Sequence, residues 1–378
     1  MDINIIRENF IELLNFNIKT YTSKVSIPIL SNVYIEARNG KLILKSTNLE
    51  NSVISFCGVE IIKEGETTVN IKNIYDFVTN LKSEIINIKF ENNTLTISDS
   101  LNKISLNTIP ADEFPDIPDN DSDLLFKVPA YDFSYALDKV TFATSTDLSK
   151  LVLSGVFFEI KDNFLKLIGI NGFRFSSFNI KGLKNIKKDI IDNIIVPSSS
   201  LDNISKIIKD LGLDNDSFVS VYLVGKNNQL IFEIDNVKFL VRLIEGKYPD
   251  YNKIFPEDYE CSFSLNVEEF KDVIKLSSIF KLKDISRIYI EIDPKENVIK
   301  FQSSLKEVGE SISIIKTKIK GVKSTVSFNS KYIMDLLNNY EAEDIEISIN
   351  SSSLKKVSKF NEKKNDDFVY LVMPLLER

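Results

Sequence analysis

One stretch of this chain occurs three times, and that repetition constrains the fold more than any other feature. Residues 67–81 (TTVNIKNIYDFVTNL) recur as residues 195–208 (IVPSSSLDNISKII) and as residues 325–337 (TVSFNSKYIMDLL). Each copy runs from a β-type segment through a valine into an amphipathic helix. The shared valine is residue 69, 196 or 326, so the copies are 196 − 69 = 127 and 326 − 196 = 130 residues apart. That period is the length of a domain rather than of a solenoid repeat, which predicts three copies of one domain.

The three predicted domains share one order of elements: strand, helix, several strands, second helix, several strands. The first helices also align, because Phe10, Phe133 and Phe270 each lie about one turn into their helix. Two segments are interpreted as linkers. Residues 110–123 contain five aspartates and three prolines, and residues 246–256 repeat their pattern of an aromatic residue before Pro-Asp. The sequence therefore predicts an α+β protein of three tandem two-helix, two-sheet domains, with boundaries at residues 1–122, 123–256 and 257–378.

Composition narrows the chemistry. The chain has 378 residues, 43% hydrophobic and 27% charged, which is typical of a globular protein. It contains no histidine, so nucleophile–histidine pairs and histidine-ligated metals are excluded. Cys57 and Cys261 are its only cysteines and lack metal-binding spacing. The glycines form no phosphate-binding motif. We expect no cofactor and no metal, no signal peptide or membrane segment, and a cytoplasmic location.

Five short motifs resemble one family. They are residues 27–32 (IPILSN), 46–50 (STNLE), 171–175 (NGFRF), 248–251 (YPDY) and 370–374 (YLVMP). In this order and spacing the chain resembles the bacterial DNA sliding clamps, the beta subunits of DNA polymerase III, over its whole length. The resemblance implies domains of two helices packed on two antiparallel sheets. Two chains would pair head to tail into a ring whose helices line a central hole.

The resemblance also implies a function. Such a ring is a non-catalytic processivity factor that encircles double-stranded DNA without sequence preference. It tethers the replicative DNA polymerase, the clamp loader and other proteins that carry a clamp-binding motif. The formal charge of −7 is wrong for a protein that grips nucleic acid over its whole surface, but it is compatible with encirclement.

Basic residues are expected locally on the side that faces DNA. The family usually has a basic pair after the Val-Pro before the second helix, whereas this chain has Ser198 and Ser199. Attraction to DNA is therefore expected to be weaker than in relatives. The alternative for the candidate lysines listed next is that they lie on ordinary solvated faces. The candidates are Lys24, Lys72, Lys82, Lys206, Lys209, Lys271, Lys275 and Lys331.

A second expected site is the family's partner pocket between domains two and three, which holds a short peptide with apolar anchors. This chain has Asn171 where the family favours aspartate, and it adds Phe175, so we expect a more apolar cleft and a shifted peptide preference. The alternative is that Phe173, Phe175 and Met373 are core residues. The candidate wall is Leu153, Ile170, Gly172, Phe173, Arg174, Phe175, Pro249, Lys253, Ile254, Leu371, Met373 and Pro374.

The dimer interface implied by the resemblance joins domain one of one chain to domain three of the other. The candidates are Ile104 and Leu106 in domain one and Ile279 and Phe280 in domain three. The alternative is that Ile279 and Phe280 are the buried end of a helix.

Two other classes of function stay open. One is a hydrolase or transferase that uses carboxylates, for example around Asp250 or Glu50, although no paired acids are evident. The other is a non-catalytic, triplicated β-rich scaffold or adhesion protein, which the missing signal peptide and the helix-bearing repeats disfavour.

Overall fold

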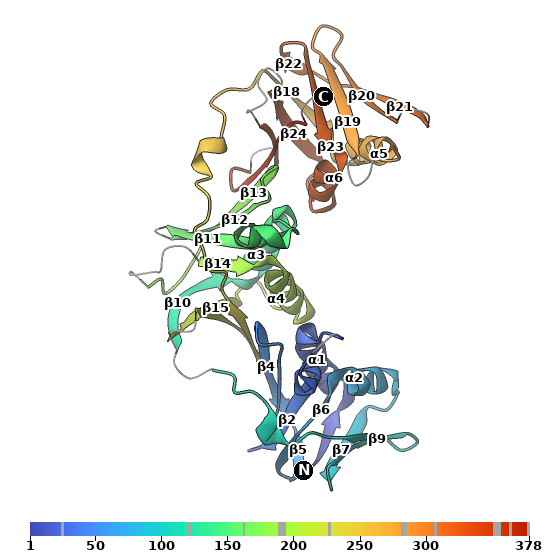
Figure 1. The fold of residues 1–378 in the computed structure, drawn as a ribbon, viewed down its shortest axis with the longest axis vertical. Coiled ribbons are helices and arrows are strands. Elements are labelled where there is room, and N and C mark those ends of the chain that lie inside the picture. Colours follow the sequence, from blue (N-terminus) through green and yellow to red (C-terminus); the bar gives the residue numbers. More distant parts are fainter. Residues whose placement is uncertain are drawn as a thin grey trace. The chain divides into compact units, whose positions relative to one another are not determined.

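A computed structural model describes residues 1–23, 26–118, 122–161, 163–187, 194–225, 228–280, 286–305, 308–350, 357–362 and 365–375. The chain forms two compact units. The first unit comprises residues 1–131, 183–190 and 203–243, and the second comprises residues 132–182, 191–202 and 244–378. Labels for both are given in Figure 1.

The first unit contains two antiparallel sheets. The five-stranded sheet has the order β5 (Glu60–Lys63), β1 (Asp2–Ile6), β7 (Ile85–Glu91), β8 (Thr94–Ser98) and β9 (Lys103–Asn107). The eight-stranded sheet has the order β10 (Ser122–Pro129), β15 (Phe218–Val224), β16 (Gln229–Ile234), β17 (Val237–Arg242), β4 (Asn51–Gly58), β3 (Lys41–Thr47), β2 (Asn32–Arg38) and β6 (Gly65–Asn70). Pairing of β17 with β4 makes one sheet from strands of two domains.

Helices α1 (Arg7–Asn17) and α2 (Ile71–Asn80) pack against each other in this unit. Phe10, Leu13 and Leu14 are fully buried on α1, the stripe that the sequence predicts. Asn17 at the end of α1 is also buried. Its amide donates to the Leu13 carbonyl at 2.8 Å and to the Ser55 hydroxyl at 2.7 Å, which satisfies a polar group that would otherwise be costly to bury.

The second unit contains the other two sheets. The nine-stranded sheet has the order β14 (Ile194–Pro197), β11 (Gly155–Lys161), β12 (Phe164–Ile170), β13 (Arg174–Ile180), β26 (Phe368–Val372), β25 (Ser358–Glu362), β24 (Asp344–Ile349), β18 (Cys261–Asn266) and β22 (Ile319–Gly321). The four-stranded sheet has the order β21 (Gly309–Lys316), β20 (Val298–Leu305), β19 (Arg287–Asp293) and β23 (Ser324–Asn329). Helices α5 (Val267–Ser277) and α6 (Ser330–Asn338) lie side by side.

The triplicated stretch folds as the sequence predicts. A strand leads directly into a helix three times: β6 into α2, β14 into α4 (Ser198–Asp210), and β23 into α6. The shared valine is buried in each copy. The earlier helix of each repeat is α1, α3 (Ala130–Val140) or α5. The fold is therefore α+β with three tandem copies of one domain, while the boundaries at residues 122 and 256 stay a prediction.

Some elements differ from the sequence prediction. The run of β-type residues at 29–36 predicts a strand, but Pro28–Ser31 is a 3-10 turn and β2 begins at Asn32. Proline at the first position of that turn has the dihedral angle that the turn needs. Strands β5 and β25 were not predicted. Both are short and carry several polar residues, so β-sheet pairing rather than hydrophobic periodicity makes them strands.

Asparagine side chains cap three of these helices. Asn266 Oδ1, before α5, accepts from the Glu269 amide at 3.1 Å, and Asn70 and Asn329 cap α2 and α6 in the same way. Asn266→Ala should lower the free energy of unfolding by about 1 kcal/mol, because an orphan amide at the helix start loses its acceptor. Asn266→Asp keeps the acceptor and should remain near wild type in urea denaturation. Equal losses in both variants would contradict capping.

Candidate functional site

A cavity of about 220 Å³ opens in the second unit where β13 of the central domain pairs with β26 of the C-terminal domain. Register places Arg174 opposite Val372 and Phe175 opposite Leu371, so both domains form one wall. The segment after residue 248 supplies the other side. The lining residues are Ile170, Gly172, Phe173, Arg174, Phe175, Pro249, Asp250, Tyr251, Lys253, Ile254, Val357, Leu371 and Met373.

A tight turn between β12 and β13 orients the residues at one edge of this cavity. Asn171 Oδ1 accepts hydrogen bonds from the amides of Phe173 and Arg174, at 2.9 and 3.0 Å. Gly172 between them has φ = 93°, a backbone conformation that favours glycine. The Phe173 carbonyl accepts from the Met373 amide at 2.8 Å, which ties the turn to the residue after β26. Asn171 is not among the residues that line the cavity, and its side chain contacts the turn that carries Phe173 and Arg174.

Aromatic rings give the cavity its apolar character. Phe175 is 1% exposed, and its ring contacts those of Tyr251 and Phe255 at centroid distances of 5.7 and 5.3 Å. Phe173 is 51% exposed, so its ring is available at the rim. The core alternative therefore holds for Phe175 and fails for Phe173. An apolar cavity with one exposed ring suits insertion of apolar anchor side chains.

A few polar groups frame this apolar wall. Tyr251 donates its hydroxyl to Glu159 at 2.8 Å, and burial together with that bond raises the pKa of the phenol. Asp250 pairs with Lys253 at 3.3 Å. Hydrogen bonds from the Asn252 amide and from Lys253 hold the pKa of Asp250 below its ordinary value. Asp250 is thus an ionised turn residue and not a proton donor poised near neutral pH.

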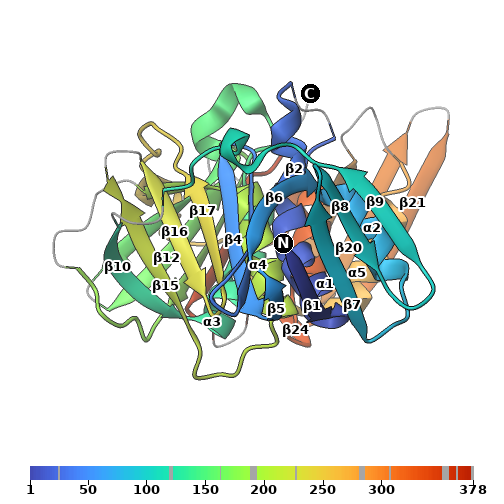
Figure 2. The same ribbon diagram turned by 90° about the horizontal axis from the view of Figure 1, so that it is seen from below.

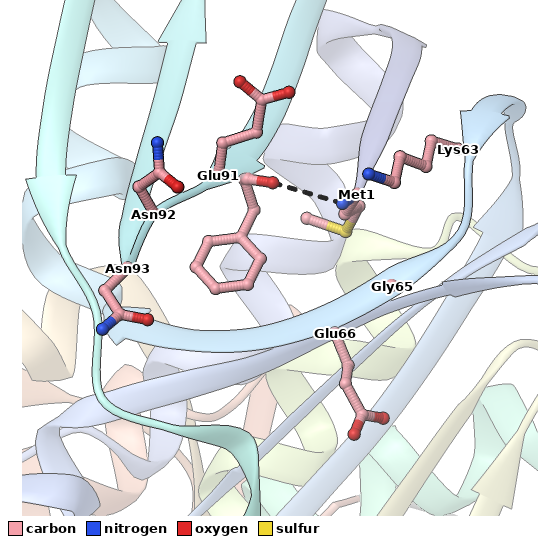
Figure 3. Close-up of a pocket in the computed structure, with 8 residues that line it drawn as sticks. Met1, Lys63, Gly65, Glu66, Glu91, Asn92 and Asn93 are labelled. Carbon is pink, nitrogen blue, oxygen red and sulfur yellow. Dashed lines mark hydrogen bonds between the residues drawn. The ribbon is translucent and has the colours of Figure 1, made fainter.

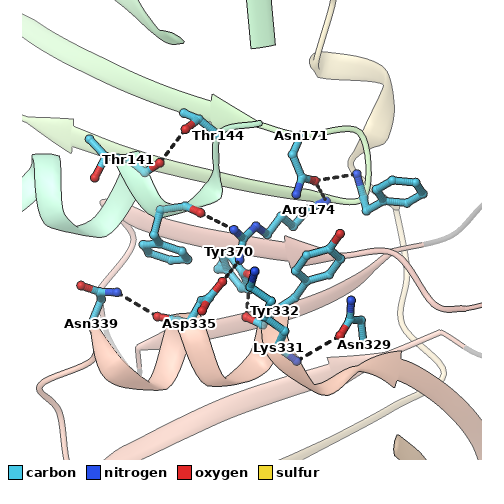
Figure 4. A network of polar contacts seen from close by, with 12 residues as sticks. Thr141, Thr144, Asn171, Arg174, Asn329, Lys331, Tyr332, Asp335, Asn339 and Tyr370 are labelled. Atoms are coloured by element: carbon cyan, nitrogen blue, oxygen red, sulfur yellow. Dashed lines mark hydrogen bonds and ion pairs between the residues drawn. The ribbon is translucent and has the colours of Figure 1, made fainter. Parts of the chain in front are cut away.

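Arg174 lies beneath the turn and is 8% exposed (Figure 4). Its guanidinium donates to the Asp335 carboxylate of α6 at 2.6 Å and to the Phe142 carbonyl. The same group lies over the rings of Tyr332 and Phe142, 4.7 and 5.5 Å from the centroids. An arginine between two phenylalanines needs a partner if it is buried, and Asp335 is that partner.

A second buried cation holds the same helix. Lys139 of α3 is 4% exposed, and its ammonium donates to the Asn339 carbonyl just after α6. Burial lowers the pKa of this lysine. A cation at a helix C-terminus is favoured by the helix dipole. Lys139 and Arg174 therefore fix the last turn of α6 from two points in the central domain.

The structure brings most of the predicted wall together. Ten of the twelve candidates line the cavity, and Leu153 and Pro374 do not. Three lining residues were not predicted. Asp250 and Tyr251 belong to a motif that the sequence analysis quoted, so their position between Pro249 and Lys253 was an available signal. Val357 lies in a polar stretch with no motif, and nothing in the sequence indicated it.

The predicted DNA-facing lysines are mostly exposed on or near helices. Lys72 pairs with Asp76 on α2 at 2.6 Å, and Lys275 pairs with Asp272 on α5 at 3.1 Å. The charge of each of these two candidates is therefore offset by a carboxylate of its own helix. Lys271 on α5 is half-buried. Lys24 lies outside the described residues. The exposed candidates are Lys72, Lys82, Lys206, Lys209, Lys275 and Lys331.

The predicted interface residues lie at or near two sheet edges. Ile104 and Leu106 are on β9, the outermost strand of its sheet (Figure 2), and both are half-buried against the first core. Strand β21 is the outermost strand of the four-stranded sheet. Ile279 follows α5 and is 70% exposed, which argues against a buried helix end, and Phe280 is half-buried. Unpaired strand edges are templates for pairing with another chain.

A second cavity, of about 560 Å³, lies in the first unit (Figure 3). The Met1 ammonium donates to the Phe90 carbonyl at 3.3 Å there, and burial lowers the pKa of that amino group. The remaining lining residues are mainly polar or charged, so this larger cavity offers few apolar contacts to anchor side chains. It does not resemble a peptide pocket.

Three other findings bear on function. Among the described residues, no group of three or more carboxylate or cysteine side chains could hold a metal ion. No helix in the described part of the chain is long and apolar enough to cross a membrane. Glu50 lies in an exposed turn, where its backbone amide donates to Asn48 Oδ1 at 3.1 Å.

Comparison with known proteins covers the whole chain. Models of the DNA polymerase III beta subunit match in order: the N-terminal domain at residues 1–118, the central domain at 127–250 and the C-terminal domain at 252–376. A beta sliding clamp of Staphylococcus epidermidis is 25% identical over 385 residues, covering 99% of both chains. The Bacillus subtilis DNA polymerase sliding clamp has a TM-score of 0.90 at 23% identity, and a Pseudomonas aeruginosa sliding clamp bound to griselimycin has 0.91 at 21%. Both cover 100% of each chain.

The buried pair gives a stability test. Asp335→Ala should destabilise the second unit by about 3 kcal/mol, because Arg174 would remain buried as an unpaired cation. Replacing both partners, in Arg174→Met with Asp335→Leu, should recover most of that loss in urea denaturation. A double variant less stable than Asp335→Ala would contradict this account.

Proposed function

Because this chain belongs to the DNA polymerase III beta subunit family, we propose that it is a sliding clamp, a DNA polymerase processivity factor. Two chains form a head-to-tail ring that encircles duplex DNA and tethers the replicative polymerase. The observation that carries this proposal is the match of all three domain models, in order, over residues 1–376. The scaffold alternative has no comparable support.

The sheet edges support a closed ring. Strand β9 of one chain would pair with β21 of the other, which removes two exposed edges and joins two sheets. Ile104 and Leu106 would pack with Ile279 and Phe280 at this junction. Six domains in one ring would then have similar junctions all round, as the triplicated sequence requires for a regular ring.

DNA would pass through the hole and face the helices. We assign Lys24, Lys82, Lys206, Lys209 and Lys331 to this surface, together with Lys72, Lys271 and Lys275. Internal ion pairs on α2 and α5 weaken the attraction of two of them. Retention on DNA would depend on closure of the ring more than on phosphate contacts, which suits sliding.

The cavity at β13 and β26 would bind partner proteins. We propose that an extended peptide segment of the polymerase, the clamp loader and other clamp-binding proteins inserts apolar anchors there. Phe173 and Met373 would contact the anchors, and Phe175 would form the floor. The wall also includes Leu153 and Pro374 in our proposal, at its periphery. The phenylalanine floor supports a peptide preference shifted from that of relatives.

We infer further that the chain has no catalytic activity of its own and acts in the cytoplasm as an accessory subunit. It would contribute to DNA synthesis only by encircling DNA and by binding the polymerase. It would raise the effective concentration of polymerase at the primer end without touching the reacting atoms.

Electron-microscope imaging with light scattering on the same sample tests the proposal. We expect closed rings with six similar lobes and a mass of two 43.1 kDa chains. Monomers or open three-lobed rods at every concentration, with or without DNA, would contradict it.

Peptide capture depends on the anchor contacts. Met373→Ala should weaken binding of a consensus clamp-binding peptide about tenfold, because truncation removes apolar contact in the cavity. Met373→Leu keeps the volume and should bind nearly as wild type in fluorescence anisotropy. Unchanged affinity in Met373→Ala would refute the assignment of this cavity.

Ring closure depends on apolar contact at the interface. Ile279→Glu should convert dimers to monomers at micromolar concentration in light scattering, because a carboxylate would be buried there without a partner. The matched control is Ile62→Glu, since Ile62 is also exposed, at 61%, and lies on the other edge of the β9 sheet. The control should stay dimeric. Equal dissociation of both variants would argue against the proposed interface.

A further inference from the structure

Three exposed apolar side chains at two sheet edges have no part in the sites described above. Leu101, in the turn between β8 and β9, is 91% exposed, the highest value among the large apolar side chains of the described residues. Ile312 and Ile314 on β21 are 48% and 57% exposed. Strands β9 and β21 are the outermost strands of their sheets. Exposed apolar residues beside an unpaired strand edge mark an interaction surface.

The turn that carries Leu101 is held by its own hydrogen bonds. The Asp99 carboxylate accepts from the amides of Leu101 and Asn102, at 2.8 and 2.6 Å, and from the Ser83 hydroxyl at 2.8 Å. The bonds from Leu101, Ser83 and Asn102 lower the pKa of Asp99 to about 2, so this acceptor stays ionised at neutral pH. The exposed position of Leu101 is therefore set by a defined turn.

Two junctions inside the chain show how one repeat pairs with the next. Strand β4 of the N-terminal domain pairs with β17 of the central domain, and β13 of the central domain pairs with β26 of the C-terminal domain, each through five antiparallel residue pairs. One further amide extends each run directly. Phe56 donates to the Asn236 carbonyl at 3.2 Å, and Asn179 donates to the Asp367 carbonyl at 2.9 Å. The two junctions thus share one register.

Strand β21 is the counterpart of β4 and β13. Each of the three is the second strand of a hairpin whose first strand is β20, β3 or β12. The third residue of that first strand is paired with Phe56 in β4, with Asn179 in β13 and with Ile314 in β21. Ile314 therefore occupies the position from which Phe56 and Asn179 donate. Ile312 lies two residues before it on the same exposed face of the sheet.

Strand β9 is the counterpart of β17. The Ile109 and Ile244 amides donate, at 3.2 and 2.9 Å, to the carbonyl of the residue just before the shared valine of the triplicated stretch. Leu101 precedes Ile109 by 109 − 101 = 8 residues, and Asn236 precedes Ile244 by 244 − 236 = 8 residues. Leu101 therefore occupies the position at which Asn236 accepts an amide across the first junction.

We propose that Leu101 of one chain packs against Ile312 and Ile314 of a second copy of the chain, an inference that rests on the proposed ring and adds a contact at its junction. In the shared register, the Ile314 amide would donate to the Leu101 carbonyl of the other chain. Side chains directly opposite each other in an antiparallel pair have Cβ atoms about 4.5–5.5 Å apart, so Leu101 and Ile314 would be in contact. Ile312 would be the diagonal neighbour of Leu101.

The two junctions inside the chain have polar side chains at this position. Asn236 faces Phe56 in the first junction, and Asp367 faces Asn179 in the second. Those junctions join parts of one covalent chain, whereas a junction between two chains depends on noncovalent contact alone. Burial of apolar surface stabilises such an association. A foreign protein would lack the matching register, so a second copy of the chain is the favoured occupant.

The first test is the dimer dissociation constant, measured by light scattering over a dilution series. Leu101→Asn introduces the residue type of the matched position, Asn236, in an exposed turn. It should weaken each junction about tenfold and, because a ring has two junctions, raise the dissociation constant about a hundredfold. The control Leu49→Asn removes another exposed leucine, in the turn between β3 and β4, and should dimerise as wild type. Equal thermal unfolding of the variants would show that both are folded.

The second test is the register. With Leu101→Cys and Ile314→Cys in one chain, oxidised glutathione should link two chains, because opposite residues of paired strands lie within the Cα separation of a disulfide, about 4.4–6.8 Å. The matched control combines Leu101→Cys with Glu310→Cys, four residues and about 13 Å away along β21. It should give no linked dimer on a non-reducing gel. The wild-type chain controls for Cys57 and Cys261.

Each outcome decides the inference. A dissociation constant for Leu101→Asn equal to that of wild type would overturn it, as would equal losses in Leu49→Asn or a link through residue 310 and not 314. If Leu101→Asn dimerises as wild type but loses binding to the replicative polymerase, the surface docks that protein and the inference fails. The ring proposal is tested separately. A dimeric wild type with an unchanged variant leaves the ring intact, whereas a wild type that is monomeric at every concentration contradicts both.

Discussion

The buried ion pair between Arg174 and Asp335 is the interaction on which the second unit depends. One guanidinium joins β13 of the central domain to α6 of the C-terminal domain, and it is enclosed by the rings of Phe142 and Tyr332. A buried charge is costly unless it is paired, so this junction tolerates little change in the relative position of the two domains. Lys139 donates to the Asn339 carbonyl just after the same helix, so two residues of the central domain hold α6 in place.

This constraint also sets the geometry of the pocket. Arg174 immediately follows Phe173, and the Phe173 ring stacks on Tyr332 of α6 at 6.5 Å. The rim of the cavity, the buried cation and the helix are therefore one continuous set of contacts. A peptide that contacts Phe173 would therefore bind a side chain whose position is already fixed by its contacts with α6. Such preorganisation favours affinity, because little conformational entropy is lost on binding.

The sequence was most informative where one residue type has one physical role. The repeated valines and the apolar stripes of the helices predicted the triplicated strand–helix unit. Gly172 was part of a quoted motif, and its positive φ is the physical reason for a glycine at that position. Interactions between distant residues were out of reach: nothing marked Asp335 as the partner of Arg174, or Val357 as part of the cavity. Strands β5 and β25 exist through pairing with neighbours, which no local pattern encodes. The sequence shows which residues are charged. Only the structure shows which lysines are already in ion pairs, such as Lys72 with Asp76, and so attract phosphate less.

Encirclement is the central claim, and topology tests it directly. The chain would be loaded by a clamp loader onto nicked circular duplex DNA, washed at 0.5 M salt and separated from free protein by gel filtration. The account predicts that the protein stays on the circle at high salt and is released when a restriction enzyme linearises the DNA. Retention on the linear product, or loss from the intact circle at high salt, would mean that the chain binds the DNA surface and does not surround it.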